Sequence, residues 1–270
     1  MSKKRVIFTL LFDGNDFVLS RNFRLQKVGN LEWLRKNYQF EKTARSIDEL
    51  IVLNVCRSES SINNFAQALK DITFGCFVPV TAGGGIRSLE DATLLLRSGA
   101  DKIVINTLLH TDPEIVTRIA QKFGKQCVVA SIDILKLEDA GYKLFYENGA
   151  TLSQFDVQSV LRQICEGPVG EIYLNSINQD GTGNGYDLGM LDLLPDTCSK
   201  PVIVAGGVGN FTHLDEGLKD SRVSAVATAH LFNFVGNGLE SARNKLSALG
   251  HEFPKWNYPM DLHEIDGRDK

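Results

Sequence analysis

The chain repeats itself at a constant distance of 122 positions. The matching segments are Pro79-Val80 and Pro201-Val202, Gly84-Gly85 and Gly206-Gly207, Glu49-Leu50 and Glu171-Ile172, and 6–12 and 128–134. A shared ungapped register across four segments indicates a duplicated half-domain, because the period is too long for a short solenoid repeat. The 270 residues are therefore predicted to fold as two related halves.

Short apolar runs rich in β-branched residues alternate with amphipathic segments along both halves. Continuous hydrophobicity is typical of parallel strands that are buried on both faces. The predicted strands cover 5–12, 49–55, 77–82, 102–106, 127–134, 171–176, 202–205 and 224–228, and predicted helices include 89–98, 113–123, 157–166 and 239–249. Eight βα units favour an α/β fold of the (β/α)8 barrel type over a doubly wound sheet, which does not explain two copies of four strands.

Length and charge narrow the classes of function. One barrel over residues 1–250, followed by a C-terminal tail over 251–270, is the expected domain organisation. The net charge of −4, without a basic block, argues against a nucleic-acid partner. The N-terminal apolar run is short and lacks a small-residue cleavage site, and no segment is long enough to cross a bilayer. A cytoplasmic protein without membrane contact is expected.

The five cysteines have no CxxC or metal-ligand spacing, so neither a metal nor another cofactor is predicted. Cys56, Cys76 and Cys127 lie in or beside apolar runs and are predicted to be reduced core residues.

Glycine-rich turns follow the third and seventh predicted strands. Backbone N–H groups in such turns bind phosphate, and the N-terminus of the next helix adds its dipole. The candidate residues are Gly84, Gly85, Asn106 and Thr107 in the first half and Gly206, Gly207, Thr228 and Ala229 in the second. Two such sites on opposite sides of a barrel mouth suit a ligand with a phosphate at each end. The alternative is that the glycines only make tight turns.

Polar residues also follow the fifth and sixth predicted strands. The loop containing Asp180, Gly181 and Thr182 is either a cluster of turns or a ligand-binding rim, and its place after a barrel strand favours the rim. Asp133 ends the fifth strand, where its carboxyl is a candidate general acid or base, with a structural Asp as the alternative. The repeat places Leu11 opposite Asp133, where a symmetric site would carry a second carboxylate.

Four charged residues, Arg5, Glu49, Lys102 and Glu171, lie at or near the starts of predicted strands. Strand starts meet at the N-terminal end of a barrel, so these residues can form a ring of salt bridges there. Such a ring either plugs the barrel for stability or acts as a gate for a small molecule.

Together these features resemble the HisF family, the cyclase subunits of imidazole glycerol phosphate synthase. The resemblance spans about residues 3 to 235 and is carried by segments 82–86, 100–107, 131–133, 180–187 and 205–207. It implies a barrel that pairs with a glutaminase subunit, receives ammonia through its interior and uses it on a bis-phosphate substrate. The four charged residues are then the ammonia gate. Gly84, Asn106 and Thr107 hold one phosphate, and Asp180, Gly181, Gly207 and Thr228 or Ala229 hold the other.

The departures from the family pattern concern acid–base residues. The family uses two catalytic aspartates, of which Asp133 matches one and Leu11 replaces the other. The lysine usual in the first loop falls on Leu19, and two further acidic positions are Asn54 and Asn178. Three functions therefore stay open. The first is imidazole glycerol phosphate synthesis, and the second is a non-catalytic ammonia conduit. The third is implied by a similarity to cyclase-like paralogues of sugar amidotransferase pathways, namely ammonia delivery to a phosphosugar for amidination or amination in surface-polysaccharide or nonulosonic-acid biosynthesis.

Overall fold

The computed structural model describes residues 3–38, 46–57, 62–74, 76–229 and 238–255. Within these ranges eight parallel strands form a barrel: β1 (Arg5–Asp13), β4 (Glu49–Asn54), β5 (Val80–Gly83), β6 (Lys102–Ile105), β7 (Val128–Leu137), β10 (Glu171–Ser176), β11 (Val202–Ala205) and β12 (Val223–Thr228). Each pairs with the next, and β12 pairs with β1 to close the cylinder. The predicted (β/α)8 barrel is confirmed.

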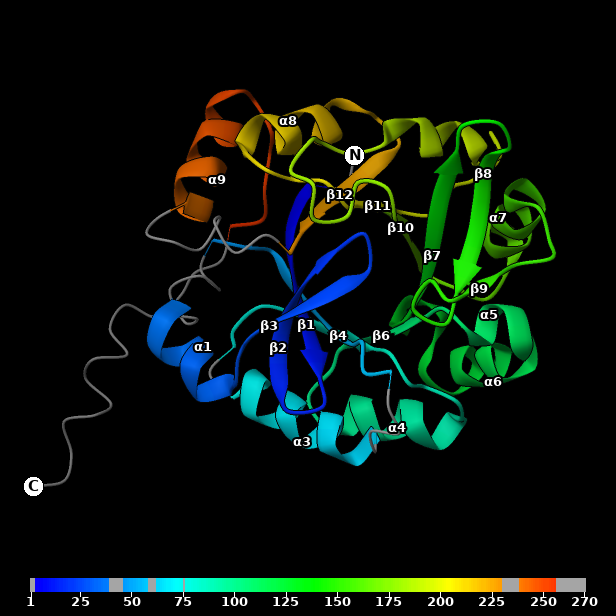
Figure 1. Cartoon of the computed structure of the whole chain (residues 1–270), viewed down its shortest axis with the longest axis horizontal. Coiled ribbons are helices and arrows are strands. Elements are labelled where there is room, and N and C mark those ends of the chain that lie inside the picture. Colours follow the sequence, from blue (N-terminus) through cyan, green and yellow to red (C-terminus); the bar gives the residue numbers. More distant parts are fainter. Residues whose placement is uncertain (1–2, 39–45, 58–61, 75, 230–237, 256–270) are drawn as a thin grey trace, which may run out of the picture.

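Helices surround the strands (Figure 1). They are α1 (Leu31–Tyr38), α3 (Ile62–Thr73), α4 (Leu89–Arg97), α5 (Leu108–Thr111), α6 (Pro113–Phe123), α7 (Val157–Glu166), α8 (Phe211–Lys219) and α9 (Gly238–Ala248), with short 3₁₀ helices at η1 (Lys125–Cys127) and η2 (Leu188–Leu193). No helix in the described ranges is both long and apolar enough to cross a membrane.

The sequence of α6 illustrates why these helices begin and end where they do. Asp112 caps its N-terminus by accepting a hydrogen bond from the N–H of Ile115, and Pro113 occupies the first turn. Gly124 follows the last residue with φ +89°, a conformation that favours glycine. The buried side chains recur at helical spacing, which directs one face of α6 toward the barrel.

The strand register carries the duplication into three dimensions. In the first half Ile7 of β1 lies opposite Glu49 of β4, and in the second half Val129 of β7 lies opposite Glu171 of β10. Both members of the second pair are 122 positions after their counterparts in the first. The two halves therefore share strand pairing as well as sequence.

The last strands of the two halves, β6 and β12, are related by an offset that is one residue longer. Thr81 of β5 lies opposite Lys102, whereas Ile203 of β11 lies opposite Ala225, next to a register shift in β11. Ala225 is thus the counterpart of Lys102, and Ala229 becomes the counterpart of Asn106. Thr228, one residue earlier, then faces the surrounding helices by strand alternation.

Two antiparallel extensions follow the C-terminal ends of β1 and β7. They consist of β2 (Asp16–Arg21) with β3 (Arg24–Gly29), and β8 (Gly141–Tyr146) with β9 (Thr151–Leu152). The β2–β3 turn holds Asn22 and Phe23 at φ +50° and +62°. Tight hairpins need such positive φ values, and they usually supply Asn-Gly or Asp-Gly. Phe23 occupies the position where glycine is usual, so the sequence analysis did not predict the hairpin.

The buried apolar residues form two separate layers. A large outer layer lies between strands and helices and includes the fully buried Phe65, Leu95 and Ile119. A smaller inner layer fills the barrel itself and consists of Ile7, Ile51, Val104, Val129, Tyr173, Ile203, Ala205, Ala225 and Ala227. The barrel interior is therefore a packed core.

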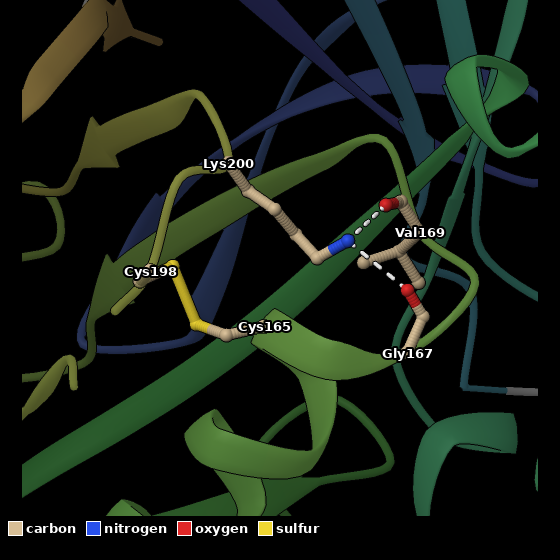
Figure 2. Close-up of a disulfide and its surroundings, with 5 residues drawn as sticks. All are labelled: Cys165, Gly167, Val169, Cys198 and Lys200. Atoms are coloured by element: carbon tan, nitrogen blue, oxygen red, sulfur yellow. Dashed lines mark hydrogen bonds between the residues drawn. A yellow bond between two sulfur atoms is a disulfide. The ribbon is translucent and has the colours of Figure 1, made fainter. Parts of the chain in front are cut away.

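A disulfide joins Cys165 of α7 to Cys198, with 5.3 Å between their Cα atoms (Figure 2). Lys200 closes the same corner, because its Nζ donates hydrogen bonds to the carbonyl oxygens of Gly167 at 3.0 Å and Val169 at 2.6 Å. The remaining three cysteines form no disulfide and are partly exposed rather than fully buried. No pairing motif in the sequence marks Cys165 and Cys198, which lie 33 residues apart.

The matched glycine turns have a steric cause that is the same in both halves. Gly84 has φ +90°, and a Cβ there would lie 2.0 Å from the carbonyl oxygen of Asn54. Gly206 has φ +89°, and a Cβ there would lie 2.7 Å from the carbonyl oxygen of Ser176. Only glycine allows this close approach of one loop to the end of the neighbouring strand.

We predict that Gly84→Ala destabilises the protein much more than Gly141→Ala. Both glycines have positive φ, but a Cβ at Gly141 meets nothing within 4 Å. Conformation alone costs roughly 1–2 kcal/mol for alanine, so Gly141→Ala isolates that cost while Gly84→Ala adds the clash. Urea unfolding monitored by circular dichroism measures the difference, and equal midpoints for the two variants would contradict the prediction.

Candidate functional site

The four predicted charges meet at the N-terminal end of the barrel. Arg5 Nη1 lies 2.6 Å from Glu49 Oε2, and its Nη2 contacts Glu171 Oε1. Lys102 Nζ lies 2.8 Å from Glu49 Oε1 and 3.1 Å from Glu171 Oε2. Each carboxylate therefore faces both cations, and the four side chains form a closed ring, here called the charged ring.

The charged ring is almost fully buried on its acidic side. Glu49 is 2% exposed and Glu171 is 5% exposed. Thr81 adds a hydrogen bond from Oγ1 to Glu49 Oε1 at 2.5 Å. Burial alone would lower the pKa of Arg5, but Glu171 and Glu49 together raise it. Two positive and two negative charges thus compensate one another, which buried ions require.

Asp133 lies at the opposite end of the barrel, between two amides. Asn175 Nδ2 donates to its Oδ1 at 3.0 Å, and Asn106 Nδ2 donates to its Oδ2 at 3.2 Å. Burial raises the pKa of Asp133 to about 7, against the lowering effect of the Asn175 hydrogen bond and with a smaller contribution from the charge of Asp180. A carboxyl with such a pKa both gives and takes protons near neutral pH.

Asn175 is a residue that the sequence analysis missed. Strand alternation contains a signal for it, because Glu171 and Asn175 lie four positions apart on β10 and share its inner face. The signal was overlooked because the amide belongs to a different strand from the Asp133 that it contacts.

The symmetric position in the first half is apolar. Leu11 lies opposite Leu53 in the β1–β4 pairing, as Asp133 lies opposite Asn175 in the β7–β10 pairing. Both leucines are partly exposed, and neither can donate or accept a proton. This position is therefore polar in the β7–β10 pair and apolar in the β1–β4 pair.

The first candidate phosphate site is assembled in part. Gly84 and Gly85 lead from β5 to α4, which is capped by Ser88, whose Oγ accepts a hydrogen bond from the N–H of Asp91. Asn106 Nδ2 donates hydrogen bonds to Asp133 Oδ2 and to the carbonyl oxygen of Ser131. Thr107 makes no side-chain capping bond at the start of α5. The phosphate role of these residues stays a prediction.

The residues of the second candidate site have structural contacts of their own. Asp180 Oδ2 accepts hydrogen bonds from Ser20 Oγ at 2.5 Å and from the N–H of Phe23 at 3.0 Å, which fixes the tip of the β2–β3 hairpin. A Cβ at Gly181 would lie 2.2 Å from the Ser20 carbonyl oxygen. Thr182 Oγ1 donates to the carbonyl oxygen of Gln179. These contacts account for the loop composition without a ligand.

The Gly206-Gly207 turn lies across the barrel from the first site, since β5 and β11 are four strands apart in either direction. A Cβ at Gly207 would lie 2.0 Å from the carbonyl oxygen of Gly185, so the loop after β10 packs directly on this turn. Asn210 caps α8 as Ser88 caps α4, again 122 positions later.

The neutral residues at the family's charged positions make specific contacts. Asn178 Oδ1 accepts from the N–H of Lys136 at 2.6 Å, and its Nδ2 donates to the Lys136 carbonyl oxygen at 3.0 Å. A carboxylate has no proton for the second bond. Asn54 Oδ1 accepts from the N–H of Cys56. Leu19 lies within β2, opposite Gln26.

Comparison with known proteins shows the family of the chain. The family described as histidine biosynthesis protein matches residues 30–236. The chain belongs to that family. A protein of Parasynechococcus marenigrum (strain WH8102), provisionally named imidazole glycerol phosphate synthase subunit hisF2, is 46% identical over 245 residues, which cover 91% of each chain. The predicted resemblance to the HisF family is confirmed.

Asp133 should make the stability of the fold depend on pH. Its raised pKa lets the folded protein keep a proton that the unfolded chain has lost, so this group destabilises the fold as the pH rises from about 4 toward 7. We expect the free energy of unfolding of Asp133→Asn, relative to that of wild type, to increase by about 2–4 kcal/mol as the pH rises from 4 to 8. Urea unfolding at several pH values measures this, with Asp139→Asn in an exposed turn as control. Parallel pH curves for Asp133→Asn and wild type would refute the assignment.

Proposed function

We propose that this protein is the ammonia-using, cyclase-type subunit of a glutamine amidotransferase. A glutaminase partner docks at the end of the barrel that carries the charged ring. Ammonia passes the ring, crosses the interior and reacts with a phosphorylated substrate held beside Asp133. The observation that carries this proposal is the placement of a buried ring of charges and a buried carboxyl at opposite ends of one barrel.

The charged ring and Asp133 have different roles at the two ends of the barrel. Ammonia enters when one ion pair of the ring opens, for example that between Lys102 and Glu171, which has the longest of the four ion-pair distances. At the other end, Asp133 takes a proton from the attacking nitrogen or returns one to the leaving oxygen. Asn106 and Asn175 hold the carboxyl in place for this transfer.

The two glycine turns support a substrate with two phosphate groups. Each presents backbone next to a helix N-terminus, and the turns lie on opposite sides of the barrel mouth. A bis-phosphate suits both turns, and the histidine-pathway bis-phosphate precursor is the first compound to test. A phosphosugar of a surface-polysaccharide or nonulosonic-acid pathway is the second candidate, favoured by the apolar pair Leu11 and Leu53 in place of a second acid–base group.

Turnover of the bis-phosphate precursor with saturating ammonium at alkaline pH tests the reaction. We expect Leu11→Asp to exceed wild type by at least tenfold, because a second positioned acid–base group contributes roughly 10²–10⁴-fold. Asp133→Asn in the Leu11→Asp background is the matched control and should lose the gain. Wild-type turnover equal to that of Leu11→Asp would show that Leu11 is tolerated. Binding of the precursor without turnover by either protein would instead favour the phosphosugar.

Removal of a ring cation should uncouple the two activities. In the complex with a glutaminase partner, Lys102→Ala leaves Glu49 and Glu171 without one of their two cations and opens the ring. We expect less product per glutamine hydrolysed, measured as the ratio of product to glutamate. Lys200→Ala is the control, since its ammonium group lies outside the ring and binds backbone carbonyls. An unchanged ratio in Lys102→Ala would contradict the role of the ring as a gate.

A further inference from the structure

One strand connects the charged ring to Asp133. The inner face of β10 carries Glu171 in the ring, then Tyr173, then Asn175, which binds Asp133. Tyr173 is only 5% exposed and belongs to the layer of side chains that fills the barrel. A molecule that travels from the charged ring to Asp133 along the inner face of β10 passes Tyr173.

Tyr173 is unusual for its position. Its counterpart in the first half is Ile51, and in the described residues no other member of the inner layer is aromatic. Three alanines of that layer, Ala205, Ala225 and Ala227, leave room for the larger ring. A tyrosine also brings a hydroxyl into an otherwise apolar layer, and buried hydroxyl groups need hydrogen-bond partners.

Thr9 supplies a second hydroxyl in the same region. It is 4% exposed, and its Oγ1 is buried without a hydrogen bond of normal geometry among the described residues. Burial raises the pKa of Tyr173, and a weak side-chain hydrogen bond with Thr9 opposes this rise. The Thr9 hydroxyl therefore has Tyr173 within reach but no well-aligned hydrogen bond, and a small molecule that donates to Thr9 Oγ1 and accepts from the Tyr173 O–H satisfies both groups.

We propose that Thr9 and Tyr173 form an inner ammonia site between the charged ring and Asp133. The O–H of Tyr173 donates to the nitrogen lone pair, and Thr9 Oγ1 accepts an N–H. No bond is made or broken at this step. The aromatic ring closes the barrel axis, so ammonia advances as Tyr173 moves. This inference rests on the proposed function, and it adds a second barrier to the route.

The inner ammonia site favours neutral ammonia over the ammonium ion. By strand alternation, the inward side chains between the charged ring and Asp133 carry no charge in the described strands. An ammonium ion there would lack a counterion and lose its hydration, whereas neutral ammonia needs only hydrogen bonds. Burial keeps the pKa of Tyr173 above its ordinary value, so its hydroxyl stays protonated as a donor.

Crystallography of the wild-type chain from ammonium-containing solution tests the site without a partner or substrate. We expect one solvent-sized density peak within hydrogen-bond distance of Thr9 Oγ1, and its loss in Thr9→Val, which has the same shape without the hydroxyl. A direct Thr9–Tyr173 hydrogen bond with no guest would overturn the proposal. Thr9→Ser keeps the hydroxyl and should keep the guest.

Kinetics of the complex with a glutaminase partner tests whether ammonia passes through the inner site during catalysis. For Thr9→Val and Tyr173→Phe, the glutamine-dependent rate should fall about three- to tenfold more than the rate with external ammonium, as expected for one lost hydrogen bond. Ile51→Val, which removes one methyl group from the same layer, is the control. Equal losses with both nitrogen sources would overturn the proposal. Absence of product from both sources would refute the proposed substrate, while the crystal structures still decide whether the inner site exists.

Discussion

The charged ring is the constraint on which the rest of the barrel depends. It draws side chains from β1, β4, β6 and β10, so it fixes the starts of strands from both halves relative to one another. Loss of one partner from a buried ion pair typically costs about 3–5 kcal/mol, because the other charge stays buried. Ala225, the counterpart of Lys102, carries no charge, so the ring is asymmetric although the barrel is built from a repeat.

Duplication has preserved the backbone more faithfully than the chemistry. The turns at Gly84 and Gly206 approach equivalent carbonyl oxygens, and equivalent residues cap the helices that follow. Proton transfer needs particular atoms, and here the halves differ, because Leu11 and Leu53 occupy in the first half the positions of Asp133 and Asn175 in the second. Backbone geometry is held by close packing on every side, whereas an acid–base group at the mouth is free to diverge when the substrate changes.

The sequence predicted the features that depend on local burial and missed those that depend on contacts between distant residues. The bounds of β10 and β11 were predicted correctly because continuous apolar runs mark strands covered on both sides. The one-residue slip of β12 was not visible, because a register shift changes pairing without changing composition. The disulfide and the contacts of Asn106 and Asn175 with Asp133 were missed for the same reason, since each joins separate elements. The assignment of site residues to phosphates and to the gate stays a prediction.

Exclusion of water links the two ends of the barrel in the proposed function. A dry interior favours neutral ammonia over ammonium, and the same lack of hydration raises the pKa of Asp133 toward 7. One condition therefore supplies both an unprotonated nucleophile and a carboxyl suited to proton transfer at neutral pH.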